Sequence, residues 1–341
     1  MIRSRAVALV AVVAGAVGLG VLTVPAGAGT APSLPDITAE ELVGSVLSAR
    51  APAFGGTVEV DNALGLPALP GLSAPDGSSP LTDAVHTVRV WSDGDGRGRL
   101  AVPFRGGEQT YVEDGSTLWR YDSASRTATA LEHDARVAAE QPPVADPAAA
   151  ARALVGEVRS TSTVTVDGTA SVAGRPAYEL VLTPAPMERT LLREVRVAVD
   201  SAERLPLRLT VLANGSTDPA LQVGFTDLDV GPQDPGLFRF SPPSGVTVER
   251  RSPEGTPELR AGPAVSTTGD GWDTVVLGRL PVGSGETGPL AMARQVGRPV
   301  SGPWGSGWVV DTAVGAVLVA SDGRVAAGAV PQQVLAEALA Q

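Results

Sequence analysis

The stretch Thr57-Val58-Glu59-Val60-Asp61 alternates between polar and apolar side chains. A period of two is typical of a β-strand with one buried face. The same kind of pattern returns in residues 85–91, 100–102 and 109–112. Short turns, such as Asp93-Gly94-Asp95-Gly96, join these segments. This part of the chain is therefore predicted to form an antiparallel meander.

Two helices are predicted beside the strands. The first covers residues 38–49, where Thr38 and Glu41 have the spacing of a capping box. The second covers residues 146–158, with Asp146 as N-cap and Pro147 in the first turn. After the second helix the strand pattern resumes, over residues 162–166, 178–182, 194–199, 205–212 and 221–225.

A second, smaller unit is predicted at the C-terminal end. The polar residues 251–255 resemble a linker, which divides the mature chain into a domain at 37–250 and a domain at 256–341. The smaller domain is expected to contain strands near 274–277, 307–311 and 316–320. Its last helix begins at Pro331 and carries an apolar side, Val334, Leu335, Ala338 and Leu339.

The first 28 residues have the three parts of a secretory signal peptide. Arg3 and Arg5 are basic, residues 6–22 are apolar apart from glycine, and Ala26-Gly27-Ala28 is a small-residue cleavage site. We expect cleavage after Ala28 and a soluble, extracytoplasmic mature chain; the alternative is an uncleaved membrane anchor. Since the sequence has no cysteine, a bacterial lipoprotein anchor and disulfide bonds are both excluded.

The charge and composition exclude several classes of function. The net charge is −11, and removal of two arginines with the signal peptide makes it −13. An acidic protein of this kind is not expected to bind nucleic acid or an anionic membrane surface. With no cysteine, two histidines and no lysine, the chain cannot form a zinc site of the usual Cys/His kind, a Walker A loop or a Schiff base.

Catalytic motifs do not change this interpretation. No Gly-x-Ser-x-Gly elbow occurs. Residues 283–288 match Gly-x-Gly-x-x-Gly, but Pro289 follows and no acidic residue stands at the later position that a dinucleotide site requires. A flexible loop is the better interpretation. The protein is therefore not expected to be an enzyme or to hold a metal or cofactor.

Two stretches resemble a known family. The first, Glu113-Asp114-Gly115-Ser116-Thr117-Leu118-Trp119-Arg120-Tyr121-Asp122, resembles the D-G-x-x-L-W-x-Y segment of LolA-like lipoprotein carriers. The second runs from Phe225-Thr226-Asp227-Leu228 to Leu237-Phe238-Arg239-Phe240-Ser241-Pro242-Pro243-Ser244-Gly245-Val246 and resembles the end of that domain. The sigma-factor regulators of the MucB/RseB type share this fold and also carry a smaller second domain.

The resemblance implies an α+β fold. Its main domain would be a strongly curved antiparallel sheet, a half-barrel capped by helices, and a smaller α+β domain would follow. An apolar cavity would lie between sheet and helices. One departure concerns the turn after Trp91, where the outer-membrane carriers have a basic residue beside a proline; here residues 92–96 are Ser-Asp-Gly-Asp-Gly. The latch of those carriers is therefore not expected.

A concave sheet face could enclose an acyl chain, because alternate side chains of each strand point to the same side. Each methylene group removed from water contributes about 0.8 kcal/mol. The alternative is that the same residues form an ordinary filled core under the helices. We assign these residues to the apolar face: Val58, Val60, Val88, Val90, Leu100, Val102, Leu180, Leu182, Val197, Val199, Leu209, Val211 and Phe225, with Trp119 and Tyr121 beside them or at the rim.

The loop from Leu64 to Leu72 is a further candidate. Its leucines, Leu64, Leu66, Leu69 and Leu72, stand among proline and glycine and fit no regular element. It is predicted to be a flap over the cavity or a docking surface for a partner; the alternative is that it folds back on the sheet.

Two functions follow from these observations. The leading prediction is an envelope protein that binds a lipid or a lipoprotein acyl chain. The alternative is an RseB-like sensor that contacts an anti-sigma factor or another membrane-anchored protein.

Overall fold

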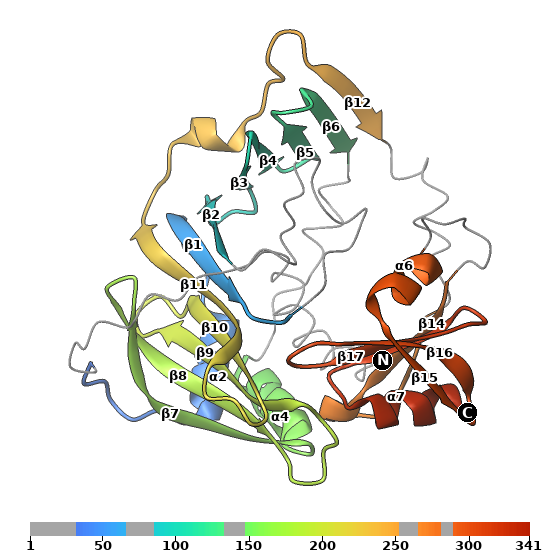
Figure 1. Ribbon diagram of the computed structural model, residues 1–341. Helices are drawn as coiled ribbons and strands as arrows, with labels where there is room; N and C mark the ends of the chain where they lie inside the picture. The colour runs from blue at the N-terminus through green and yellow to red at the C-terminus, as the bar shows by residue number, and fades with distance from the viewer. Residues whose placement is uncertain (1–31, 66–84, 133–146, 252–264, 281–288) are drawn as a thin grey trace.

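The computed structural model describes residues 32–65, 85–132, 147–251, 265–280 and 289–341 and shows two sheets (Figure 1). The larger has the order β12-β6-β5-β4-β3-β2-β1-β11-β10-β9-β8-β7. Its strands are β1 Phe54–Asn62, β2 Val85–Ser92, β3 Gly98–Phe104, β4 Gly107–Glu113, β5 Thr117–Asp122, β6 Thr127–Glu132, β7 Ser162–Val172, β8 Arg175–Pro184, β9 Leu192–Asp200, β10 Pro206–Ala213, β11 Pro219–Val230 and β12 Thr247–Arg251.

The larger sheet is an open arch. Its edges are β12 and β7, so the sheet does not close on itself. All pairs are antiparallel except β12 with β6, which is parallel. The chain reaches this distant edge by a long connection, residues 231–246, which contains the short helix η1 (Pro235–Phe238). Figure 1 shows this connection on the outer side of the arch. The predicted open, curved, mainly antiparallel sheet is confirmed.

Two helices cover one part of the sheet. Helix α2 (Ala39–Ser48) begins with the predicted capping box between Thr38 and Glu41. Helix α4 (Pro147–Val158) begins at the predicted proline; its expected N-cap, Asp146, lies outside the described residues. Buried residues of both helices, Leu42 and Val155 among them, pack on side chains of β7, β8 and β9. The helices therefore form the core of one half of the arch.

The smaller sheet has six strands in the order β13-β14-β18-β17-β16-β15. The predicted last helix is α7 (Gln332–Leu339), and all four predicted apolar residues on it are buried against the sheet. The elements are β13 Ser266–Thr268, η3 Gly271–Asp273, β14 Val275–Arg279, α6 Pro289–Val296, β15 Arg298–Gly302, β16 Gly305–Asp311, β17 Ala316–Ala320 and β18 Arg324–Gly328.

The two sheets are separated between Arg251, the last residue of β12, and Ser266, the first of β13. The predicted linker begins at Arg251, and its other residues, 252–255, lie outside the described part of the chain. The predicted signal peptide, 1–28, lies outside it as well. The domain boundaries stay predictions.

A buried carboxylate holds the corner between β9 and β10. Asp200 is 1% exposed, and its oxygens accept hydrogen bonds from the Nε of Arg175 (2.5 Å) and from the amides of Ala202 (2.8 Å) and Glu203 (2.6 Å). Burial alone raises the pKa of Asp200, but the bonds from Arg175 and the two amides outweigh it, so the pKa lies below the usual value. The ionised carboxylate therefore stabilises this corner.

We predict that Asp200→Ala lowers the free energy of unfolding at pH 7 by about 3 kcal/mol, because Arg175 loses its partner and two amides lose their acceptor. Urea unfolding followed by circular dichroism measures the change. Asp218→Ala, at an exposed position on the turn before β11, is the control and should change stability little. Equal effects of the two substitutions would contradict this account of the corner.

The lowered pKa of Asp200 also predicts how the stability of the protein changes with pH. A carboxyl group with a lowered folded-state pKa contributes stability above its unfolded value, here 3.8, and the contribution is lost as pH falls through the folded value. The difference in stability between wild type and Asp200→Ala should therefore shrink as pH is lowered from 5 into that range. Urea midpoints at a series of pH values test this; a difference that stays constant would contradict it.

Candidate functional site

The strand register divides the larger sheet into two faces. We define the inner face as the one that carries Val58. Val88 of β2 and Phe225 of β11 lie opposite Val58 and therefore share this face. The other side, the outer face, carries Trp119 and Tyr121, whose rings lie 5.3 and 5.6 Å from the ring of Phe240. Phe240 belongs to the connection on the outer side of the arch (Figure 1). The inner face is therefore the concave side.

The predicted apolar residues fall mostly on the inner face. The strand register places thirteen of the fifteen there. Six lie on β1 to β3: Val58, Val60, Val88, Val90, Leu100 and Val102. Seven lie on β8 to β11: Leu180, Leu182, Val197, Val199, Leu209, Val211 and Phe225. Alternation along each strand places these residues on one face; their role in binding a ligand stays a prediction.

The placement of Trp119 and Tyr121 is a correction. Leu100 lies opposite Tyr111, and Tyr111 lies opposite Arg120, so Arg120 shares the inner face. Its neighbours Trp119 and Tyr121 therefore point outward, where Trp119 lies opposite buried Val112. The turn between β4 and β5 sets this register, and a shift of one residue exchanges the faces. Both aromatic residues belong to the packing under Phe240 and do not line the concave side.

Four of the inner-face residues have a core role under the helices, and a fifth, Phe225, packs against a separate buried cluster of Val172, Ala177, Ala198 and Leu207. Leu180, Leu182, Val197 and Val199 pack in the clusters formed with α2 and α4. Leu42 of α2 is fully buried there, and Val155 of α4 is 3% exposed. In this half of the arch the space between helices and sheet is occupied by side chains, so the cavity that the family resemblance implied between helices and sheet is not supported at these residues.

The candidate site is the remaining inner face, from β10 across β11, β1 and β2 to β3. It carries the other nine predicted residues: Val58, Val60, Val88, Val90, Leu100, Val102, Leu209, Val211 and Phe225. Val60, Val88 and Val102 are buried and the other six are partly exposed. Other apolar residues on the same face were missed, among them Leu221 and Val223, which continue the alternation that ends at Phe225.

A glycine makes room for the largest side chain of this surface. A Cβ on Gly56 would lie 3.0 Å from the ring of Phe225 and 2.5 Å from the carbonyl oxygen of Asp227. Phe225 also meets Phe54 edge to face, with ring centroids 5.7 Å apart. The small residue therefore lets the two aromatic rings lie across the junction of β1 and β11.

The inner face changes character on either side of the site. Beyond β3 it carries the polar residues Gln109, Tyr111 and Arg120, with Leu118 of β5 and Leu131 of β6 farther along. On the β9 side it continues into the apolar residues that pack under α2 and α4. The ion pairs of Glu179 with Arg208 (2.8 Å) and of Glu194 with Arg196 (2.9 Å) lie on the opposite, outer face.

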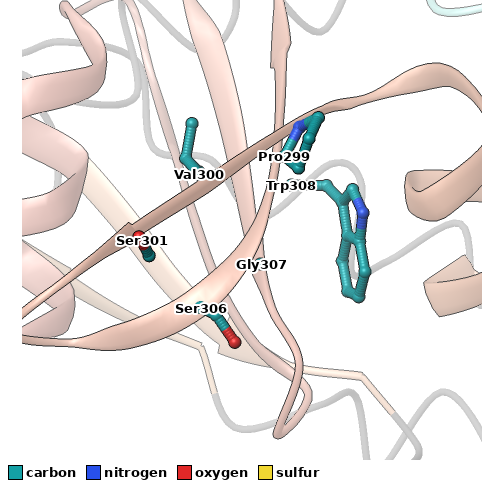
Figure 2. Close-up of a pocket in the computed structure, with 6 residues that line it drawn as sticks. All are labelled: Pro299, Val300, Ser301, Ser306, Gly307 and Trp308. Carbon is teal, nitrogen blue, oxygen red and sulfur yellow. The ribbon is translucent and has the colours of Figure 1, made fainter.

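One shallow pocket lies elsewhere. It has a volume of about 320 Å³ and is lined by residues of the hairpin of β15 and β16, Trp308 and Pro299 among them (Figure 2). The guanidinium carbon of Arg294, on α6, lies 5.0 Å from the centre of the Trp308 ring. Within the described ranges, no cluster of three or more acidic, histidine or cysteine side chains could hold a metal ion.

The predicted flap is described only at its start. The amide of Leu64 donates to the side-chain oxygen of Asn62 (3.1 Å), and its carbonyl accepts from the amide of Ala313 (2.8 Å). Leu66, Leu69 and Leu72 lie outside the described residues, so the flap stays a prediction. No helix among the described residues is long and apolar enough to span a membrane.

Comparison with solved structures found MucB and LolA-superfamily proteins among the structures similar to this chain. The Pseudomonas aeruginosa MucA/MucB complex is 19% identical over 87% of this chain and 94% of that chain, with a TM-score of 0.46. MucB alone is 22% identical over 89% and 96%, with a TM-score of 0.45. A LolA-superfamily protein of Nitrosomonas europaea is 14% identical over 60% and 99%, with a TM-score of 0.24.

No family model and no curated protein matched the sequence. These three similarities have TM-scores below 0.5. The function proposed below is therefore derived from the residues of this chain.

We predict that Gly56→Ala lowers the free energy of unfolding by about 1–3 kcal/mol, because the added methyl group meets Asp227 and the ring of Phe225. The control is Gly156→Ala, in helix α4, where a Cβ meets no atom within 4 Å. That change should raise stability by about 0.5–1 kcal/mol. Thermal and urea unfolding of both variants test the difference in sign; a Gly56→Ala protein as stable as wild type would contradict the close packing at β1 and β11.

Proposed function

We propose that the protein binds an apolar ligand, a lipid or the acyl chain of a lipoprotein, on the inner face between β10 and β3. The observation that carries this proposal is the apolar surface of nine residues on the concave side, six of which are partly exposed. Apolar side chains that line a concave surface are a usual feature of sites for small molecules. The helices α2 and α4 pack on the other part of the same face.

The curvature of the sheet supplies the physical basis. An acyl chain on a flat surface keeps one side in water, whereas a concave surface removes more of it from solvent. At about 0.8 kcal/mol for each methylene group, an enclosed chain of ordinary length gains on the order of 10 kcal/mol. A register that keeps valine, leucine and phenylalanine on the concave side across five strands therefore suits such a ligand.

The proposed place of action is outside the cytoplasmic membrane. The support is the basic, apolar and small-residue order of the first 28 residues. A lipid ligand agrees with a place in the cell envelope.

A second candidate is a sensor that contacts a membrane-anchored protein, such as an anti-sigma factor, without carrying lipid. It is favoured by the packed region under α2 and α4, which leaves less of the concave face for a ligand. One of the solved neighbours is a complex of MucB with the periplasmic part of MucA. The two candidates differ in whether an apolar ligand binds the chain alone.

The experiment compares a double variant, Val58→Asn with Val90→Asn, against wild type in binding a fluorescent fatty acid. Both valines are partly exposed on the inner face, so the fold should tolerate the change. Loss of each apolar contact costs about 0.8–1.5 kcal/mol, so the double variant should bind roughly ten- to a hundredfold more weakly.

The matched control is Val248→Asn, on edge strand β12, where the valine is 36% exposed and lies opposite Ala128 of the outer face. This variant should bind as wild type does. Equal affinity of all three proteins, each shown to be folded by circular dichroism, would remove the inner face as the site. Absence of binding by wild type, together with capture of one membrane protein, would support the sensor.

A further inference from the structure

One loop of the larger unit contacts the smaller unit at several points. This loop, residues 185–191 between β8 and β9, is called the strap. The amide of Trp272 donates to Glu188 (2.9 Å), and Arg189 forms two hydrogen bonds with Glu337 of α7 (2.7 and 3.0 Å). The hydroxyl of Thr190 (2.6 Å) and the amide of Leu191 (2.9 Å) both donate to the carbonyl of Ala329. Four consecutive residues of the strap thus contact three parts of the smaller unit.

Two further contacts lie at the same end of the larger sheet. The indole Nε1 of Trp272 donates to the hydroxyl of Ser162 at the start of β7 (2.6 Å). The amide of Ala313 donates to the carbonyl of Leu64, just after β1 (2.8 Å). Figure 1 shows the smaller unit beside the ends of these strands. The contacts define one joint between the two units.

The joint is polar. Each of the four apolar clusters in the structure takes its buried residues from one unit: one cluster from the smaller sheet with α7, and three from the larger sheet with its helices. The contacts across the joint are hydrogen bonds and the ion pair of Arg189 with Glu337, whose side chains are both 47% exposed. Polar contacts of this kind are sensitive to the charge of the groups that make them.

Glu188 is the group at this joint whose charge is unfavourable. Burial raises the pKa of Glu188 above its usual value; the amides of Trp272 and Asp273 oppose this, and the carboxylates of Asp273 and Asp270 raise it further. Asp270 and Asp273 belong to the smaller unit, around η3. The nearest cation of the strap, Arg189, is held by Glu337. Docking therefore places a carboxylate against two others.

We propose that the joint is a pH-sensitive contact, in which docking of the smaller unit on the strap is strengthened when Glu188 takes up a proton. Protonated Glu188 keeps an oxygen that can accept the hydrogen bond from the amide of Trp272. Because it is uncharged, the carboxylates of Asp270 and Asp273 no longer repel it. This inference does not depend on the proposed ligand, since it concerns the contact between the two units alone.

The pH dependence of docking follows from the difference between the pKa of Glu188 in the docked and the separated state. When the units separate, Glu188 returns to its usual pKa of 4.5, which is lower than its value in the docked state. Docking is therefore strongest below 4.5 and weakens as pH rises through the docked-state value. The change is about tenfold in the docking constant for each pH unit between the two values. Arg189 lowers the pKa of Glu337, so this ion pair persists above pH 4.5.

The experiment uses the full mature chain. Since the sequence has no cysteine, Ala124→Cys in the turn after β5 and Gln341→Cys at the end of the smaller unit allow two dyes to be attached. Energy transfer between the dyes reports separation of the units, and its midpoint in urea is measured from pH 4 to 7.5, a range that includes the usual pKa of 4.5. The midpoint of the wild type should fall as pH rises.

The decisive variant is Glu188→Gln, which mimics the protonated group. Its midpoint should be high at pH 7.5 and should lack the part of the pH dependence that Glu188 supplies. The matched control is Glu132→Gln, at the exposed last residue of β6, and it should behave as wild type does. Arg189→Gln should lower the midpoint at every pH while keeping the dependence. A Glu188→Gln protein with the wild-type pH dependence, or a wild type with none, would overturn the proposal; circular dichroism confirms that each variant is folded.

Discussion

The antiparallel pairing of β1 with β11 is the interaction on which the larger sheet depends. It joins the meander β2 to β6, which follows β1 in the sequence, to the meander β7 to β11. The register brings Val58 opposite Phe225, with a bulge at this point in β11. Without this register the apolar residues of the two halves would not lie on one concave side. Gly56, which admits the ring of Phe225, belongs to the same junction.

The two faces of the arch are covered by different segments of the chain. On the outer face, Phe238 is 1% exposed and Phe240 packs over Trp119 and Tyr121, so the connection to β12 forms a second core there. On the inner face, α2 and α4 form a core with β7 to β9. The stretch from β10 to β3 has the same apolar character as these two cores. We propose this stretch as the part of the arch that binds a ligand.

Much of this arrangement could be predicted from the sequence, because alternation and helix caps are local signals. The capping box at Thr38 and the buried side of α7 are examples. The face of Trp119 could not be predicted, because it depends on the register across a turn. Strand β6 was missed because its alternation of threonine with small alanines is a weak apolar signal, and the parallel pairing of β12 is a long-range contact. The joint at Glu188 has no sequence signal, since its acidic neighbours come from a distant segment.

Binding of an apolar ligand to the concave surface between β10 and β3 can be measured directly. The measurement is native mass spectrometry of the mature protein purified from its own cell envelope, with the mass compared before and after denaturation. We expect an additional mass of a lipid or acylated species that is lost on denaturation. A protein that carries the bare polypeptide mass, and does not take up lipid from added vesicles, would contradict this expectation.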